Sequence, residues 1–322
     1  LNSMIELSRV KEIFEGIHKE IGKVIIGQDE TVRLMLAALL VKGHILMEGV
    51  PGTAKTLTVK TAAEIIGASF RRIQMTPDLM PSDVLGTNIF DARSGSFHVH
   101  KGPIFSDLVL VDEINRAPAK TQSALLECME ERQVTIEGNC FELSPIFTVM
   151  ATQNSLEYEG TYPLPEAQLD RFLFKIMLDY PAEQAEREIL GRFEAGFRSD
   201  NIKKVGLSHV ADIEEIKECR EAITRVHTKE PVVAYITDIV RATRDWSDFQ
   251  IGAGVRASIG LLLASKAVAL MDGREFVTPD DVKAVVCPVL RHRVILKPEA
   301  EIEGISADMA LTTVLGRVKV PR

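Results

Sequence analysis

The sequence has few cysteines, and their spacing excludes two classes of small cross-linked protein. Only four are present among 322 residues, and no two of them form a CxxC pair. Cysteines paired at short spacing are typical of zinc sites and of disulfide frameworks in secreted domains. We therefore expect reduced thiols in a cytoplasmic protein, at Cys128, Cys140, Cys219 and Cys287.

Long apolar runs are also missing. The longest, at residues 34–41 and 260–264, are far shorter than the roughly 20 residues that a membrane-spanning helix needs. Charged side chains interrupt the N-terminal segment from Glu6 onward, so no signal peptide is expected. The pattern predicts a protein without membrane insertion.

An excess of positive charge is absent as well. The chain has 38 Lys and Arg residues against 46 Asp and Glu residues, which leaves a formal net charge of −8. A protein that binds nucleic acid mainly through electrostatics has the opposite balance, so we expect no nucleic-acid partner. The basic clusters are short, and we interpret Arg291-His292-Arg293 as the solvated end of a helix.

The chain is long enough, and apolar enough, for about two domains. Hydrophobic residues make up 46% of it, and a domain has roughly 150 residues. Before Pro181, short apolar runs alternate with helical segments, whereas after it only helical spacing is found. A Thr-Pro-Asp-Asp run at 278–281 predicts a helix start in the second part. We therefore predict an α/β domain over 1–181 and an all-helical domain over 182–322.

Short apolar runs predict the strands of the first domain. The run Leu-Val-Leu-Val at 108–111 does not alternate with polar residues, which is typical of a strand buried on both faces of a parallel sheet. Helical segments between the runs predict an α/β fold with such a sheet. Turn clusters within 86–105 and 133–143 predict two inserted β-hairpins. The expected strands cover residues 44–48, 70–75, 107–112, 146–152 and 172–178.

Residues 49–56 read GVPGTAKT, which matches the phosphate-loop pattern GxxxxGK[ST] except at one position. A predicted strand precedes the loop and a predicted helix follows it. Backbone N–H groups in such a loop point at phosphate oxygens, and the helix N-terminus adds partial positive charge. Lys55 would contact the β and γ phosphates of ATP, and Thr56 would bind Mg²⁺. The other residues expected to bind nucleotide here are Gly49, Val50, Pro51, Gly52, Thr53, Ala54 and Leu57.

The departure from the pattern is Ala54, which replaces the second glycine. At this position the loop is already turning into a helix. Alanine adopts right-handed helical angles readily, so we expect Ala54 to lie outside the positive-φ region. On this motif alone, an ordinary turn between a strand and a helix remains the alternative.

Two acids, Asp112 and Glu113, follow the apolar run 108–111. The carboxyl end of a parallel strand is where α/β sheets bind ligands, and two charges there are costly without a cation. We expect Asp112 to hold Mg²⁺ through water and Glu113 to act as general base on the attacking water. Asn154 follows the next strand and would hold that water or sense the γ-phosphate, although such an asparagine is usually a turn residue.

Together the motifs resemble those of the MoxR family of AAA+ ATPases. After GVPGTAKT come VDEINRA at 111–117, ATQN at 151–154, LPEAQLDRF at 164–172 and GVRASIGLL at 254–262, in the order of the family. The resemblance covers nearly the whole chain. It implies an AAA+ P-loop core with a five-stranded parallel sheet, the two hairpins as insertions, and a C-terminal helical lid.

The resemblance also implies roles for individual residues. Asn154 would be sensor 1. Arg171 would be an arginine finger that reaches the γ-phosphate of a neighbouring subunit, and Arg256 would be sensor 2, acting within its own subunit. A surface ion pair is the alternative for either arginine. An arginine supplied by a neighbour implies a ring, expected to be a hexamer. The residues that would border the adenine are Ile25, Ile26 and Gly27.

The implied function is that of an ATPase which uses Mg-ATP to remodel or activate partner proteins. In this family the partner is typically a protein with a von Willebrand A domain, and the outcome is often metal or cofactor insertion. Two alternatives remain. One is a magnesium-chelatase-like ATPase subunit, and the other is an ATP-gated scaffold with little hydrolysis, against which Glu113, Asn154 and Arg171 argue.

Overall fold

A five-stranded parallel sheet forms the centre of the computed structural model, with strand order β2-β5-β8-β1-β9. The structure describes residues 5–50, 52–93, 95–154, 161–199 and 202–321, so Pro51 of the predicted loop lies outside the described residues. The five predicted strands agree with the observed ones to within two residues at each end. The observed strands are β1 Ile45–Gly49, β2 Phe70–Gln74, β5 Leu108–Asp112, β8 Thr148–Gln153 and β9 Phe174–Leu178.

Helices cover both faces of this sheet. Strand β5 is buried along the whole predicted run: Leu108 and Leu110 join one hydrophobic cluster, while Val109 and Val111 join another. The first cluster includes side chains of α1, α2 and α3, and the second includes side chains of α5. The predicted burial on both faces is therefore confirmed. These helices are α1 Leu7–Gly22, α2 Asp29–Leu40, α3 Lys55–Ile65 and α5 Ala119–Glu131.

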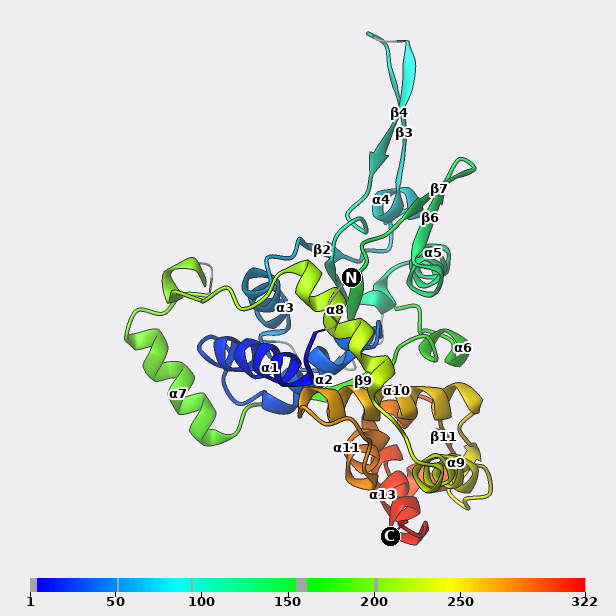
Figure 1. Ribbon diagram of the computed structural model, residues 1–322. Helices are drawn as coiled ribbons and strands as arrows, with labels where there is room; N and C mark the ends of the chain where they lie inside the picture. Colours follow the sequence, from blue (N-terminus) through cyan, green and yellow to red (C-terminus); the bar gives the residue numbers. More distant parts are fainter. Residues whose placement is uncertain (1–4, 51, 94, 155–160, 200–201, 322) are drawn as a thin grey trace.

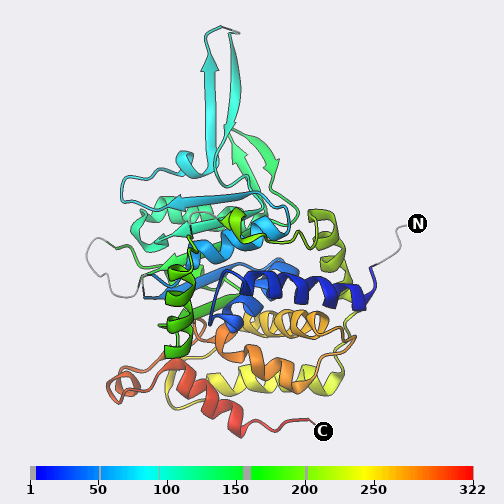
Figure 2. The same ribbon diagram turned by 90° about the vertical axis from the view of Figure 1, so that its left-hand side faces the viewer.

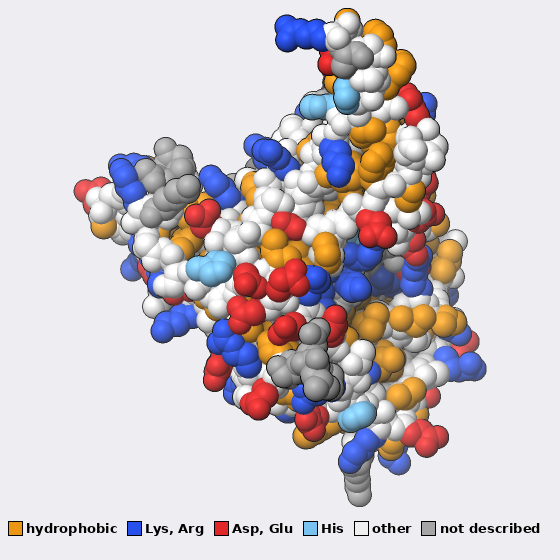
Figure 3. Space-filling model, turned by 45° about the horizontal axis from the view of Figure 1, so that its top comes forward, with side chains coloured by type: hydrophobic (Ala, Val, Ile, Leu, Met, Phe, Trp, Pro, Cys, Tyr) orange, Lys and Arg blue, Asp and Glu red, His pale blue; other side chains and the backbone are white. Residues whose placement is uncertain are grey.

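Both predicted hairpins are present, and one projects far from the body of the molecule (Figures 1 and 2). The long hairpin, β3–β4, exposes Ile89, Phe90 and Phe97 by 50%, 53% and 68%. Figure 3 shows hydrophobic side chains along it, with histidine and basic side chains nearby. Asn88 of this hairpin donates to the Glu137 carboxylate of the other at 2.6 Å. The elements here are α4 Pro81–Leu85, β3 Gly86–Asp91, β4 Ser96–Lys101, β6 Gln133–Ile136 and β7 Asn139–Glu142.

The second half of the chain is mainly helical, as predicted, but it also contains a short antiparallel ladder between β10 and β11. No helix in the described part of the chain is both long and apolar enough to cross a membrane; the cytoplasmic location stays a prediction. The helices are α6 Glu166–Leu169, α7 Glu183–Glu194, α8 Ile213–Ala222, α9 Glu230–Arg244, α10 Val255–Met271, α11 Pro279–Leu290, α12 Pro298–Ile302 and α13 Ala307–Arg317. The short remaining elements are η1 Ile114–Arg116, η2 Ile202–Val205, η3 Ile223–Arg225, β10 Phe249–Ile251 and β11 Ile295–Leu296.

The two halves share one hydrophobic cluster, which joins α1–α3 to α9–α11 and α13. A buried arginine adds polar contacts between them. Arg220 of α8 donates from Nε to the Leu39 carbonyl at 2.6 Å and from Nη2 to the Ile146 carbonyl at 3.2 Å. Burial, followed by repulsion from Arg132, lowers the pKa of Arg220 to about 9. The domain division at Pro181 stays a prediction.

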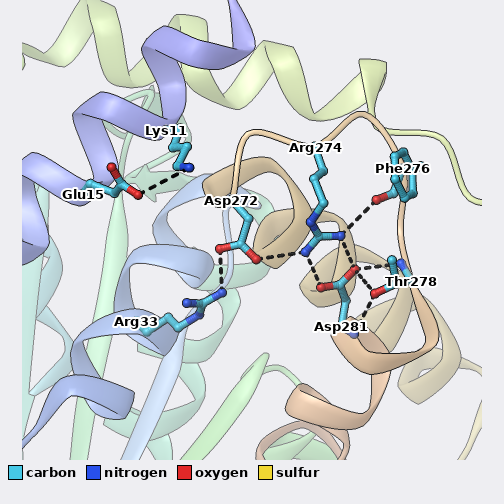
Figure 4. Close-up of polar contacts among 8 residues, drawn as sticks. All are labelled: Lys11, Glu15, Arg33, Asp272, Arg274, Phe276, Thr278 and Asp281. Atoms are coloured by element: carbon cyan, nitrogen blue, oxygen red, sulfur yellow. Dashed lines mark hydrogen bonds and ion pairs between the residues drawn. The ribbon is translucent and has the colours of Figure 1, made fainter.

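The predicted helix start at 278–281 is confirmed, and it belongs to a larger polar cluster (Figure 4). Thr278 caps α11, and the Asp281 carboxylate accepts from the Thr278 backbone N–H at 2.7 Å. Arg274 donates to both Asp281 oxygens, at 2.6 and 2.7 Å, and to Asp272 at 2.9 Å. Arg33 of α2 contacts the other oxygen of Asp272 at 2.8 Å. The cluster thus links the lid to the core.

Candidate functional site

The phosphate loop begins at the end of β1 with Gly49. Any other residue at this position would require the neighbouring backbone to shift. Gly49 is paired with Leu178 of β9, and a Cβ built on Gly49 would lie 2.0 Å from the Leu178 carbonyl oxygen. Lys55, the first residue of α3, donates from Nζ to the Gly49 carbonyl at 2.9 Å. The lysine ammonium is therefore held over the start of the loop.

Ala54 corrects one expectation. It lies in the left-handed region, with φ 55° and ψ 21°, so the prediction that it avoids positive φ is wrong. This conformation costs an L-residue roughly 1–2 kcal/mol. The helix begins immediately after it, because its carbonyl accepts from the Thr58 N–H at 2.9 Å. Such strain is maintained by the surrounding structure and is common at functional sites.

One cavity of about 540 Å³ brings together most of the predicted phosphate-site residues. The loop contributes one wall and the ends of β5 and β8 contribute another. Val50 does not line the cavity; its carbonyl accepts from the Thr53 hydroxyl at 3.2 Å. The predicted residues that line it are Gly49, Gly52, Thr53, Ala54, Lys55, Thr56, Leu57, Asp112, Glu113 and Asn154.

A buried threonine organises the two acids. The Thr152 hydroxyl donates to Asp112 Oδ1 at 2.6 Å and accepts from the Glu113 backbone N–H at 2.9 Å. Glu113 itself has φ 57°, so the chain turns sharply immediately after β5. Thr152 is the last residue of the predicted strand 146–152, two positions before Asn154, and no role was predicted for it from the sequence. The available signal was its position at the end of a strand that neighbours β5, which places its hydroxyl beside the two acids.

Strand β2 supplies two further polar residues that the sequence analysis missed. Arg72 contacts Asp112 Oδ2 from Nη2 at 2.7 Å and from Nε at 2.9 Å, and it donates to the Gln74 side chain at 2.8 Å. Gln74 donates in turn to Glu113 Oε2 at 2.9 Å. Both acids therefore have partners on β2. No sequence motif marks these residues; only the adjacency of β2 and β5 identifies them.

Burial and two nearby carboxylates set the charge state of Lys55. Burial lowers the pKa of Lys55, and the nearby carboxylates of Asp112 and Glu48 only partly offset this effect. A phosphate group at the loop would lie against the ammonium and favour its charged form.

An apolar pocket of about 230 Å³ adjoins the loop and shares Gly52, Thr53, Ala54 and Leu57 with the larger cavity. The predicted Ile25 and Ile26 line it. Gly27 does not, but it lies against α7, where an added Cβ would come within 2.8 Å of the Ala185 Cβ. The opposite wall, which was not predicted from the sequence, consists of apolar side chains on and after α7. These are Ile189, Phe193 and Phe197.

The two predicted arginines lie together in a different pocket. This pocket, of about 270 Å³, is lined by Arg171, Arg256 and residues 42–44, which immediately precede β1. The phosphate loop follows the other end of β1. A strand of five residues spans about 16 Å at roughly 3.3 Å per residue, so the arginines and the loop lie at opposite edges of the sheet.

Local contacts hold both arginines at this edge. Arg171 donates from Nη1 to the Leu126 carbonyl of α5 at 2.6 Å. Arg256 contacts Glu130 of the same helix, and its Nη1 lies 3.8 Å from Asp170 Oδ2. The expectation that Arg256 reaches the phosphates of its own subunit is therefore wrong, because the lid places it with Arg171. Both therefore lie at the end of β1 opposite the loop of their own chain.

A phosphate loop between a parallel strand and a helix, faced by two acids at the end of a neighbouring strand, defines a P-loop nucleotide-binding fold. Comparisons with known proteins agree. Residues 44–174 match the "ATPase family associated with various cellular activities (AAA)", and residues 241–314 match the "AAA lid domain".

Relatives and a solved structure narrow the class. The chain is 46% identical to Chaperone MoxR1 of Mycobacterium tuberculosis, over 94% of this chain and 81% of that protein. It is 30% identical to Protein MoxR of Methylorubrum extorquens, over 88% of each. The structure of a candidate ATPase from Cytophaga hutchinsonii matches with a TM-score of 0.89 at 42% identity, over 98% of this chain and 97% of that one. The chain belongs to the MoxR family of AAA+ ATPases.

Proposed function

We propose that this protein binds Mg-ATP at the loop of one copy and hydrolyses it with arginines from a neighbouring copy. The observation that carries the proposal is the single cavity that Lys55, Asp112, Glu113 and Asn154 share. Lys55 would hold the β and γ phosphates, and the adjoining apolar pocket is suited to the adenine. Glu113 would take the proton of the attacking water, and Asn154 would orient that water.

The donor set at this cavity fits Mg²⁺, a hard cation that prefers oxygen ligands. Thr56 offers a hydroxyl and Asp112 a carboxylate. Asp112 already binds one cationic group in the structure, because its Oδ2 contacts the Arg72 guanidinium. This contact supports the assignment of Asp112 as a ligand for a cation. Thr56 and Asp112 would hold the ion, which when bound neutralises charge on the phosphates.

The position of the arginines supports hydrolysis at an interface between copies. Arg171 and Arg256 lie at the edge of the sheet opposite the loop, so neither can stabilise the γ-phosphate of its own subunit. In a head-to-tail ring, this edge of one copy would face the loop of the next. A guanidinium placed on the γ-phosphate increases the rate of phosphoryl transfer by roughly 10³–10⁵. We expect a hexamer.

We further propose that turnover drives the remodelling of a client protein. The β3–β4 hairpin supports this role because it carries Phe90 and Phe97 into solvent as a contacting pair, with ring centroids 5.2 Å apart and the ring planes tilted by 57°. An exposed apolar patch on a projecting element is typical of a protein-binding site. A von Willebrand A-domain protein would be the partner, and metal or cofactor insertion the outcome.

Glu113→Gln tests the hydrolytic proposal. This variant should bind a fluorescent ATP analogue with near-normal affinity yet show no steady-state turnover, because the amide cannot accept the proton. Arg171→Ala should behave alike in assembled rings. Normal turnover in Glu113→Gln would remove its role as base, and negligible turnover by the wild-type chain, with and without partner, would favour the ATP-gated scaffold.

A further inference from the structure

The basic cluster Arg291-His292-Arg293, hereafter the basic strap, is not the solvated helix end that its sequence suggests. It follows α11, and the structure buries most of it: His292 is 6% exposed and the Arg293 side chain 5%. Moving a guanidinium out of water is costly unless its donors are satisfied. What the strap contacts therefore indicates what it stabilises.

All three strap residues bind one short segment of the core, residues 170–175. Arg293 donates to the Phe172 carbonyl at 2.6 Å and to the carbonyls of Asp170 and Leu173 at 3.1 Å each. Of the other two residues, His292 contacts the same Phe172 carbonyl and Arg291 contacts a carbonyl further along the chain. The His292 ring lies 3.0 Å from the Phe172 carbonyl, and Arg291 donates to the Lys175 carbonyl at 3.1 Å.

This segment is the one that carries Arg171. The strap fixes the backbone immediately before and after the arginine, at Asp170 and Phe172, while the Arg171 side chain rests on the Leu126 carbonyl. A lid element thus sets the position of a core arginine. Hydrogen bonds that served only to join the lid to the core could be made to any part of the core surface. Those of Arg293 and His292 are made to the carbonyls of residues 170–173, on both sides of Arg171.

The carboxylate of Asp170 connects the second arginine to the same element. Arg293 Nε donates to Asp170 Oδ1 at 2.6 Å, and Arg256 Nη1 lies 3.8 Å from Asp170 Oδ2. One carboxylate is therefore shared between the strap and Arg256. Burial lowers the pKa of Arg293, and the hydrogen bond that Arg293 donates to Asp170 opposes that effect.

We propose that the basic strap and Asp170 are positioning residues for Arg171 and Arg256, so that the lid of one copy controls ATP turnover in its neighbour. A shift of α11 would move both arginines together. This inference rests on the proposed hydrolysis between copies. We further infer that a nucleotide-dependent movement of the lid in one copy changes the position of its arginines at the neighbouring active site through residues 170–173.

Two substitutions test the strap. Arg293→Lys keeps the charge but loses the planar fork of donors, and the milder Asp170→Asn removes only the shared charge. A misplacement of about 1 Å typically costs about 100-fold in rate, so we expect turnover to fall by that order in both variants. Binding of a fluorescent ATP analogue should stay near the wild-type value, because the loop lies at the opposite edge.

Mixed assemblies separate an effect on the neighbour from an effect on the subunit itself. Arg293→Lys retains an intact loop, and Glu113→Gln retains intact arginines. In random equimolar rings roughly a quarter of the interfaces would combine both intact sides, so turnover should rise well above that of either variant alone. Asp170→Asn mixed with Glu113→Gln should recover in the same way.

Arg171→Ala mixed with Glu113→Gln identifies which proposal fails. If that mixture recovers but the strap mixtures do not, the inference about the strap is wrong. If the Arg171→Ala mixture also stays inactive, the proposal of hydrolysis between copies is wrong, and so is the inference about the strap.

Arg220→Lys is the matched control, because Arg220 is a buried arginine that binds backbone carbonyls away from residues 170–175. Its turnover per folded chain should stay within about twofold of wild type. A 100-fold loss there would make the strap effect nonspecific.

Discussion

Replacing Gly49 by alanine tests the close approach of the phosphate loop to β9. The added Cβ would lie 2.0 Å from the Leu178 carbonyl oxygen, and a backbone carbonyl in a ladder cannot rotate away as a side chain can. Overpacking of this kind typically costs roughly 1–3 kcal/mol, and we expect the upper end. For 322 residues each kcal/mol shifts Tm by about 1.5 °C, so Tm should fall by about 4 °C.

Gly52→Ala is the matched control within the same loop. Gly52 has φ 84°, but an added Cβ there meets no atom within 4 Å. Its substitution therefore carries only the left-handed backbone cost of roughly 1–2 kcal/mol, or about 2 °C in Tm. Thermal unfolding is compared without nucleotide, because Gly52 lines the cavity. A Gly49→Ala variant as stable as Gly52→Ala would refute the steric argument.

Three other predictions concern buried or paired charges. Burial opposes ionisation of Asp281, but the hydrogen bonds from Arg274 and Thr278 together outweigh it, and the pKa of Asp281 lies below the usual 3.8. Asp281→Asn should therefore cost about 2 kcal/mol at neutral pH, and the difference should vanish as pH falls through the lowered pKa. Arg220→Met leaves buried carbonyls unpaired and should cost about 3 kcal/mol in denaturant unfolding. Arg72→Gln frees Asp112 of a pair worth about 1 kcal/mol, so ATP-analogue binding should need roughly fivefold less Mg²⁺.

Each of these predictions has a clear contrary result. A Tm difference for Asp281→Asn that persists undiminished in acid would mean that the Asp281 charge does not stabilise the fold. An Arg220→Met variant as stable as wild type would show that desolvation of the guanidinium cancels its hydrogen bonds. For Arg72→Gln, equally weakened binding with and without Mg²⁺ would make Arg72 a phosphate ligand instead of a partner of Asp112.

The features that sequence predicted well are local ones. The buried run at 108–111, the strand-loop-helix order around Lys55 and the cap at Thr278 each depend on neighbouring residues, so periodicity and turn chemistry suffice to identify them. Both hairpins were predicted for the same reason. The acids at 112 and 113 were placed correctly beside the loop because parallel strands end at a common edge.

The features that sequence missed depend on which elements become neighbours. Arg72 and Thr152 reach Asp112 only because β2 and β8 flank β5. The family pattern identified Arg256 as a site residue, but the packing of α10 beside Glu130 and Asp170 decides at which edge it lies. Arg293 was predicted to be solvated because most of its partners are backbone carbonyls, which have no signature in the sequence, and its carboxylate partner Asp170 lies 123 positions away. The prediction for Ala54 was wrong because helix propensity does not determine the backbone angles of a residue at a helix cap.

The central claim is that each active site needs two copies of the chain, and dilution tests it most directly. Turnover per chain and binding of a fluorescent ATP analogue would be measured over a range of protein concentrations, with light scattering to follow assembly. We predict that turnover per chain falls together with the assembled fraction, while the ATP affinity of the separated chains changes little. Undiminished turnover at concentrations where scattering shows only monomers would contradict the account.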